Sequence, residues 1–243
     1  MRFYAIGDIH GHVDLLKAAH DRIRKDGGEG AQVVHVGDLI DRGPDSRGVI
    51  DYLMDGQAKG RAWLAIKGNH DRQLPHFLRD PHWIDPRAAD PRDWLARDSG
   101  AETTLASYGV ADARLRPIEA VHAEALHAVP QAHARWLDGL PLWHLTPRAL
   151  FVHAGIRPGV DLRAQSEDDM LWLRRPFQDD LRDHGVLVVH GHTPVRQPTH
   201  YGNRVNIDTG AAYGGPLTVI RLDEGGVQVV EDGGLRPLAP RDT

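Results

Sequence analysis

The stretch that decides the fold is residues 32–43, Gln-Val-Val-His-Val-Gly-Asp-Leu-Ile-Asp-Arg-Gly. Its first five residues form a short apolar run rich in β-branched side chains, which predicts a buried strand. A glycine closes the strand, and two acids three positions apart, Asp38 and Asp41, are followed at once by Arg42. A surface turn rarely needs such a set of charges. The pattern therefore predicts a strand that delivers polar groups to a ligand site at its carboxyl end.

Two flanking segments repeat this arrangement. The apolar run 2–6 leads into Gly-Asp-Ile-His-Gly at 7–11, and the run 61–66 leads into Lys-Gly-Asn-His-Asp at 67–71. Each turn places an imidazole next to an oxygen ligand. These are groups that bind divalent metal ions.

Helical patterns separate the three predicted strands. Apolar residues recur at helical spacing over 13–25 and over 46–55. Alternating strand and helix predict a βαβαβ unit with a parallel sheet. Because ligands gather beyond the carboxyl ends of strands in such sheets, the three polar turns should converge in one crevice.

The rest of the chain predicts a helical insertion followed by more strands. Residues 72–147 have little strand character and are expected to form a mainly helical insertion or cap. The later strand patterns, of which the last three suggest an antiparallel meander, are 149–152, 186–189, 204–207, 217–222 and 227–230. We expect a single domain over 1–235 and a loose tail over 236–243.

Composition narrows the functional classes. A net charge of −5 and a pI near 6.3 disfavour a generic nucleic-acid binder. With no cysteine, a metal must be held by oxygen and imidazole ligands, and a cytoplasmic location fits. The chain reaches Gly7 too soon for a signal peptide, and no stretch approaches the ~18 apolar residues of a membrane span. We expect a cytoplasmic protein with no membrane partner.

Two further motifs complete the pattern, Phe-Val-His-Ala-Gly at 151–155 and His-Gly-His-Thr at 190–193. Together with the earlier turns, over residues 7–193, they resemble the calcineurin-like metallophosphatase superfamily, especially its bacterial and phage serine/threonine phosphoprotein phosphatases. The resemblance implies an α/β (α+β) fold, a four-layer sandwich of two mixed β-sheets flanked by helices.

The resemblance also implies a pair of divalent metal ions, with Mn²⁺ first and Fe or Zn²⁺ as alternatives. One ion would be held by residues matching Asp8, His10 and Asp38. The other would be held by Asp38, which bridges, together with Asn69, His153 and His192. In the family, a hydroxide bridging the two ions attacks the phosphoryl group.

Catalytic and substrate-binding roles follow from the same resemblance. His70 matches the general acid that protonates the leaving group, and Asp41 matches the carboxylate that orients it. Arg42 and Arg174 match the arginines that bind phosphate, although Arg175 is equally placed in the sequence.

The favoured function is hydrolysis of phosphomonoesters by a serine/threonine protein phosphatase, acting on a phosphoprotein or a small phosphoester. The first alternative is a symmetrical bis(5'-nucleosyl)-tetraphosphatase, which residues 208–218 resemble, with Tyr-Gly-Gly-Pro-Leu-Thr at 213–218. Asp41 argues against it, because those enzymes tend to lack an acid there. A catalytically silent metal-bound scaffold is the second alternative, but the matching residues are all present. Nucleic acid is not an expected partner.

Overall fold

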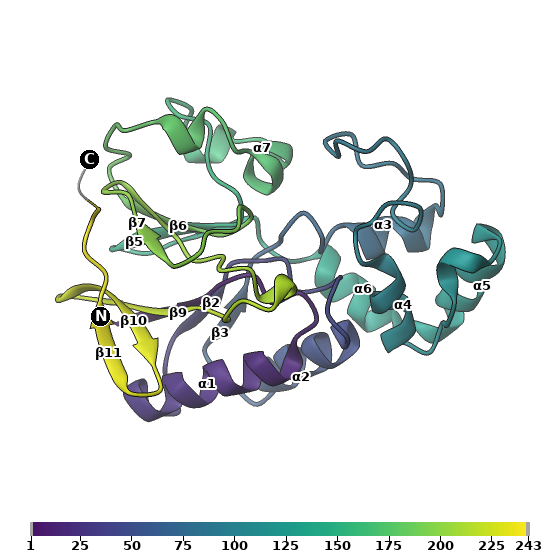
Figure 1. Cartoon of the computed structure of the whole chain (residues 1–243), viewed down its shortest axis with the longest axis horizontal. Helices are drawn as coiled ribbons and strands as arrows, with labels where there is room; N and C mark the ends of the chain where they lie inside the picture. The colour runs from purple at the N-terminus through teal and green to yellow at the C-terminus, as the bar shows by residue number, and fades with distance from the viewer. Residues whose placement is uncertain (1, 242–243) are drawn as a thin grey trace.

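The computed structural model describes residues 2–241, which form two β-sheets and flanking helices (Figure 1). The strands of the first sheet are, in spatial order, β11 (Gly234–Pro237), β10 (Gly226–Glu231), β9 (Val219–Asp223), β1 (Phe3–Ile6), β2 (Val33–His35) and β3 (Trp63–Ala65). Those of the second sheet are β4 (Trp143–Leu145), β5 (Ala149–Val152), β6 (Leu187–His190), β8 (Arg204–Asn206) and β7 (Thr199–His200).

Helices occupy the outer layers and a lateral lobe. The α-helices are α1 (Val13–Gly27), α2 (Ser46–Ala58), α3 (Gln73–Arg79), α4 (Ala101–Ser107), α5 (Ile118–Ala128), α6 (Gln131–Asp138) and α7 (Glu167–Trp172). The short 3₁₀ segments are η1 (Ala113–Leu115), η2 (Leu162–Ala164), η3 (Phe177–Asp179) and η4 (Ala211–Tyr213). Within residues 2–241, no helix has the length and apolar character needed to cross a bilayer.

The side chains of a strand point alternately to its two faces, and this alternation determines how the layers pack. Tyr4 and Ile6 of β1 belong to a buried cluster with apolar residues of α1 and α2. Their neighbour Ala5 belongs to a second cluster, together with Phe151 of β5 and Val189 of β6. Successive side chains of a strand point to opposite faces, so β1 is covered on both sides. Figure 1 shows the resulting order of α1 and α2, first sheet, second sheet and α7, which confirms the four-layer sandwich.

The parallel core of the first sheet is as predicted. Strand β1 pairs parallel with β2, with Ile6 opposite His35, and β2 pairs parallel with β3, with His35 opposite Ala65. The crossovers α1 and α2 lie on one face (Figure 1). The carboxyl ends of the three strands therefore lie at one edge, where their polar turns follow.

The predicted antiparallel meander of the last three strands is confirmed for β9 and β10, which pair antiparallel, and is wrong for β8. Strand β8 lies in the second sheet and pairs parallel with β6, with Val205 opposite Val189. Strands β9 and β10 lie in the first sheet, where β9 pairs antiparallel with β1. The segment between β8 and β9 crosses from one sheet to the other. Proximity along the chain could not show this, because both sheets offer an apolar face.

Two boundaries also differ from expectation. The insertion over 72–147 ends in a strand, since β4 pairs antiparallel with β5 across a tight turn. The stretch expected to be a loose tail begins inside β11, which pairs with β10, and the backbone nitrogen of Arg241 donates to the carbonyl of His200. Residues 242 and 243 of that tail lie outside the described residues.

Two buried histidines, His20 of α1 and His35 of β2, make the free energy of unfolding depend on pH. Nε2 of His20 lies 2.9 Å from Nε2 of His35, and Nδ1 of His20 lies 3.1 Å from the Tyr52 hydroxyl. Burial, assisted by His35, lowers the pKa of His20 to about 2. In the unfolded chain the pKa is about 6.5, so between pH 7 and pH 5 only the unfolded state gains a proton there.

We therefore expect His20→Gln, whose amide can replace both hydrogen bonds, to reduce the pH sensitivity of folding. The free energy of unfolding that wild type loses between pH 7 and pH 5 should shrink by about 2 kcal/mol in the variant. Urea midpoints at both pH values, with a chelator present throughout, provide the measurement. An equal pH dependence in both proteins would show that His20 does not carry this effect.

Candidate metal centre and active site

The loops after β1, β2, β3, β5 and β6 meet at one edge of the sandwich, and their backbone is strained. Six non-glycine residues of the described chain have positive φ, and five of them are His10, Asp38, Asp41, Arg42 and His192. Such conformations cost about 1–3 kcal/mol each and persist where the surroundings enforce them. Their concentration in these loops marks a functional site rather than ordinary turns.

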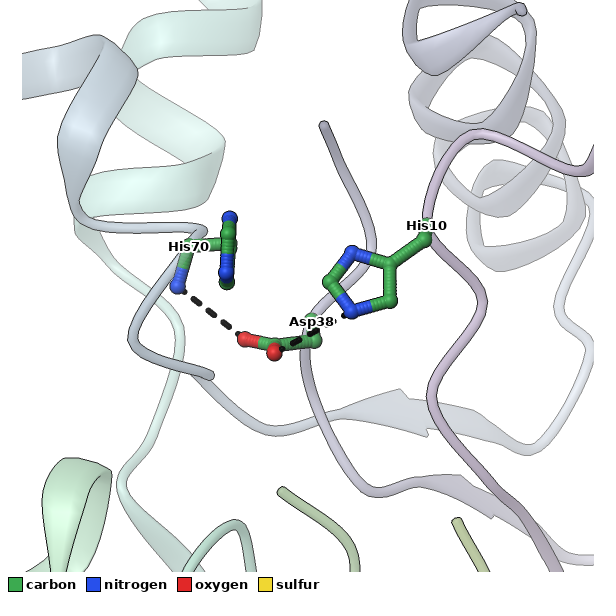
Figure 2. Close-up of side chains that lie close together, drawn as sticks. All are labelled: His10, Asp38 and His70. Atoms are coloured by element: carbon green, nitrogen blue, oxygen red, sulfur yellow. Dashed lines mark hydrogen bonds and ion pairs between the residues drawn. The ribbon is translucent and has the colours of Figure 1, made fainter. Parts of the chain in front are cut away.

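One candidate ligand group consists of His10, Asp38 and His70 (Figure 2). Nδ1 of His10 lies 2.9 Å from the carbonyl oxygen of Ile40, so this nitrogen is the donor and Nε2 carries the free lone pair. That Nε2 lies 3.4 Å from Oδ2 of Asp38, and the backbone nitrogen of His70 donates to Oδ1 of Asp38. The carbonyl oxygen of Asp38 also accepts from the backbone nitrogen of His10 at 2.8 Å, so Asp38 is hydrogen-bonded to both neighbouring loops.

The second group consists of Asp38, His153 and His192, with Asn69 between the imidazoles. Oδ1 of Asn69 lies 3.0 Å from Nε2 of His153 and 2.8 Å from Nδ1 of His192. Nε2 of His153 also lies 3.3 Å from Oδ1 of Asp38. Asp38 belongs to both groups, which is the arrangement that a bridging ligand requires.

Asp8 belongs to neither of the two groups. The structure brings His70, rather than Asp8, into one group with His10 and Asp38. Oδ2 of Asp8 accepts a hydrogen bond from the backbone nitrogen of His192, and Gly191 packs so closely that a Cβ there would lie 1.9 Å from Oδ1 of Asp8. The turn after β6 therefore holds the Asp8 carboxylate. Asp8 still lies at the same strand edge as the two groups.

The chemistry of these residues fits bound cations. Oδ1 of Asp8 and Nε2 of His192 are buried without a hydrogen-bond partner among the described residues. Burial and the carboxylates of Asp208 and Asp38 raise the pKa of Asp8 well above its usual range, and burial raises the pKa of Asp208 to about 6. Burial lowers the pKa of His10 and His192, which keeps both imidazoles neutral. Neutral imidazoles and crowded carboxylates are a donor set for divalent metal ions.

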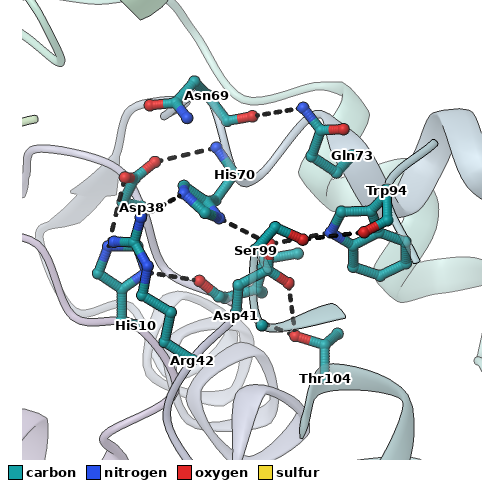
Figure 3. Close-up of polar contacts among 12 residues, drawn as sticks. His10, Asp38, Asp41, Arg42, Asn69, His70, Gln73, Trp94, Ser99 and Thr104 are labelled. Atoms are coloured by element: carbon teal, nitrogen blue, oxygen red, sulfur yellow. Dashed lines mark hydrogen bonds and ion pairs between the residues drawn. The ribbon is translucent and has the colours of Figure 1, made fainter. Parts of the chain in front are cut away.

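His70 and Asp41 form a buried pair beside this centre (Figure 3). Nδ1 of His70 lies 2.7 Å from Oδ2 of Asp41, and that carboxylate also accepts hydrogen bonds from Trp94 (3.0 Å) and Thr104 (2.8 Å). Since the Asp41 carboxylate only accepts, Nδ1 of His70 donates and Nε2 faces the site. Trp94 and Thr104 belong to the insertion, which therefore completes the active site.

Arg42 lies between the two imidazoles. Its Nη1 is 2.6 Å from Nε2 of His10, and its Nη2 is 3.0 Å from Nε2 of His70. The guanidinium also lies over the ring of Tyr213, 5.3 Å from its centroid, and this ring is 67% exposed. Arg42 is therefore a cation at the mouth of the site with an accessible aromatic ring next to it.

A pocket of about 300 Å³ opens at this mouth, and Arg174 is one of its lining residues. Arg175 does not line it, and its Nε lies 3.2 Å from Oδ2 of Asp179. Of the two arginines left open by the sequence, the geometry thus favours Arg174. Sequence reasoning missed several other lining residues, among them Gln73, Arg97, Trp172 and Tyr213.

Comparisons with known proteins agree with this geometry. The family model of calcineurin-like phosphoesterases matches residues 1–230. The asymmetrical bis(5'-nucleosyl)-tetraphosphatase PrpE of Bacillus anthracis is 27% identical over 248 residues, covering 92% of each chain. A protein of the same name from Bacillus cereus is 26% identical over 264 residues, covering 99% of this chain and 97% of its own.

Solved structures have the same fold. A candidate diadenosine tetraphosphatase aligns with a TM-score of 0.66 at 22% identity, covering 94% of this chain and 92% of the other. A cold-active protein-tyrosine phosphatase of a Shewanella species aligns with a TM-score of 0.64 at 16% identity, covering 98% and 80%. At such identities the structures support the fold alone. With the family model matching nearly the whole chain, this protein belongs to the calcineurin-like phosphoesterase family.

Proposed function

We propose that this phosphoesterase hydrolyses dinucleoside tetraphosphates. The observation that carries the proposal is Arg42, which contacts the imidazoles of the candidate metal centre and lies over the exposed ring of Tyr213. A phosphate bound by Arg42 would place its nucleoside near an aromatic surface on which a base can stack. The names of the PrpE relatives support this substrate class and an asymmetrical cleavage.

Divalent ions held by Asp8, His10, Asp38, Asn69, His153 and His192 would activate water and neutralise phosphoryl charge. Arg42 and Arg174 would bind the phosphoryl oxygens. When a phosphate draws the Arg42 guanidinium away from His70, Nε2 becomes free to carry a proton toward the leaving group. Asp41 accepts from Nδ1 and holds that ring in place.

A second candidate is the phosphomonoesterase expected from the sequence. The buried His70–Asp41 pair favours it, because an alkoxide leaving group needs a proton. A nucleoside polyphosphate can leave without a proton, since its conjugate acid is a much stronger acid than an alcohol. The pair therefore suits serine and threonine phosphoesters, while the Arg42–Tyr213 surface suits a nucleotide.

A comparison of substrates decides between the two. We expect kcat/KM for diadenosine tetraphosphate to exceed that for a phosphoserine peptide at least tenfold with one Mn²⁺-loaded sample, equivalent to about 1.4 kcal/mol of transition-state binding. Chromatography should show a nucleoside monophosphate and triphosphate in equal amounts. Two diphosphates would instead indicate the symmetrical cleavage considered from the sequence.

Tyr213→Ala serves as the matched variant. The ring is exposed, so its removal should leave the fold intact, lower kcat/KM for the dinucleotide about tenfold through lost stacking, and change p-nitrophenyl phosphate hydrolysis less than twofold. A wild-type preference for the phosphopeptide, with no effect of Tyr213→Ala, would reject the dinucleotide and support the monoesterase.

A further inference from the structure

Arg97 is a buried cation of the active-site pocket and lies outside the set of residues proposed to bind metal or the hydrolysed phosphate. It comes from the insertion, lines the same pocket as Asp38 and Arg42, and is only 7% exposed. Its one side-chain hydrogen bond within residues 2–241 is from Nη2 to Oε1 of Gln73 at 2.6 Å, and its Nε is buried without a partner. A buried guanidinium satisfied by one neutral amide is unusual, because burying a charge is costly unless it is paired.

The surrounding residues fix Gln73 in the orientation that holds Arg97. The Gln73 amide nitrogen donates to Oδ2 of Asp85 (2.7 Å) and to the carbonyl oxygen of Asn69 (3.2 Å), which leaves Oε1 to accept from Arg97. Asp85 is itself engaged by Arg72 through two hydrogen bonds. Gln73 therefore connects Arg97 to the loop that carries Asn69 of the candidate metal centre.

The acids of the pocket have other partners. Asp90 accepts hydrogen bonds from Arg92, and Asp98 lies 3.6 Å from Nη1 of Arg114. No carboxylate of the described chain lies within ion-pair distance of Arg97. Arg97 thus keeps a positive charge and free donors in a pocket wall, which is what an anionic ligand requires.

We propose that Arg97 binds a phosphate of the substrate other than the one that is hydrolysed, and thereby selects polyphosphate chains over single phosphates. The inference rests on the proposed function, since a phosphomonoester has no second phosphate. It adds a binding position on the insertion, whereas Arg42 lies directly beside His10 and His70. A guanidinium suits this task because it can donate two hydrogen bonds to one phosphate.

The test uses pyrophosphate and orthophosphate, which differ by one phosphoryl group, as competitive inhibitors of p-nitrophenyl phosphate hydrolysis at fixed free Mn²⁺. Arg97→Gln should raise the inhibition constant of pyrophosphate about tenfold or more and that of orthophosphate less than twofold. Titration calorimetry with the same two ligands gives a readout independent of turnover. Arg87→Gln, an exposed arginine of the same insertion outside the pocket lining, is the matched control and should change neither.

Equal weakening of both inhibitors, or of neither, would overturn the proposal. If Arg97→Gln does not fold, Arg97→Lys decides: retained discrimination for pyrophosphate supports the assignment, and its loss in a folded variant rejects it. Failure of wild type to hydrolyse diadenosine tetraphosphate would count against the proposed function alone, because the pyrophosphate comparison does not depend on it.

Discussion

Replacing Asp38 by asparagine is expected to lower kcat/KM on the order of 10³-fold for every substrate, with loss of metal from both candidate positions. Asp38 is the residue common to the two ligand groups, and its carboxylate also accepts the backbone hydrogen bond of His70. Asparagine has a similar shape but lacks the charge that two cations would share. Metal analysis after dialysis against buffered Mn²⁺, alongside initial rates, measures both effects.

Asp45→Asn is the matched control for this variant. Asp45 caps α2 by accepting from the backbone nitrogen of Gly48 at 2.7 Å, a task that asparagine performs equally well. Its metal content and activity should equal those of wild type. Full turnover by Asp38→Asn, or two ions retained in it, would contradict the assignment of Asp38 as the shared ligand.

The first half of the fold could be predicted because local signals and global topology agree there. Each parallel strand ends in a polar turn, and the helices α1 and α2 between them are strongly patterned. The second sheet was harder. Residues Val205 of β8 and Ile220 of β9 belong to the same buried cluster from opposite sheets, so apolar patterning alone could not assign them.

The candidate site, like the fold, could be predicted only in part. The strand-end motifs indicated which residues gather at the edge, but not which atoms face one another. His70 joins His10 and Asp38 in one group, while Asp8 accepts a backbone hydrogen bond from the turn after β6. The positions of these side chains depend on hydrogen bonds to backbone groups of distant segments. The spacing of residues along the sequence does not predict such hydrogen bonds.

The insertion was the least predictable part. Trp94 is a core residue at 1% exposure, yet its indole nitrogen also donates to Asp41. Thr104 and Arg97 gave no signal because single polar residues in a helical region usually face solvent. Their importance arises only when the insertion folds against the strand edge.

His70 is expected to contribute more to the rate as the leaving group becomes more basic. His70→Asn should slow an alkyl phosphate or phosphoserine peptide about 10²- to 10⁴-fold, because its alkoxide needs a proton at departure. It should slow p-nitrophenyl phosphate and diadenosine tetraphosphate less than about tenfold, since both release stable anions. Rates for a series of aryl and alkyl phosphates, plotted against leaving-group pKa, provide the measurement.

Asp41→Asn tests the same pair from its other member. Its amide oxygen can replace Oδ2, which accepts from Trp94 and His70, but its amide nitrogen cannot accept from Thr104 as Oδ1 does. The His70 ring is then held less firmly, so the plot of rate against leaving-group pKa should steepen in the same sense and to a smaller degree. Metal content should stay that of wild type in both variants, which separates proton transfer from ligand loss. Two results would contradict the role of His70 as the acid: an equal fall in rate for all substrates of the series, or a fall in metal content that parallels the fall in rate. His70 would then act as a metal ligand together with His10 and Asp38.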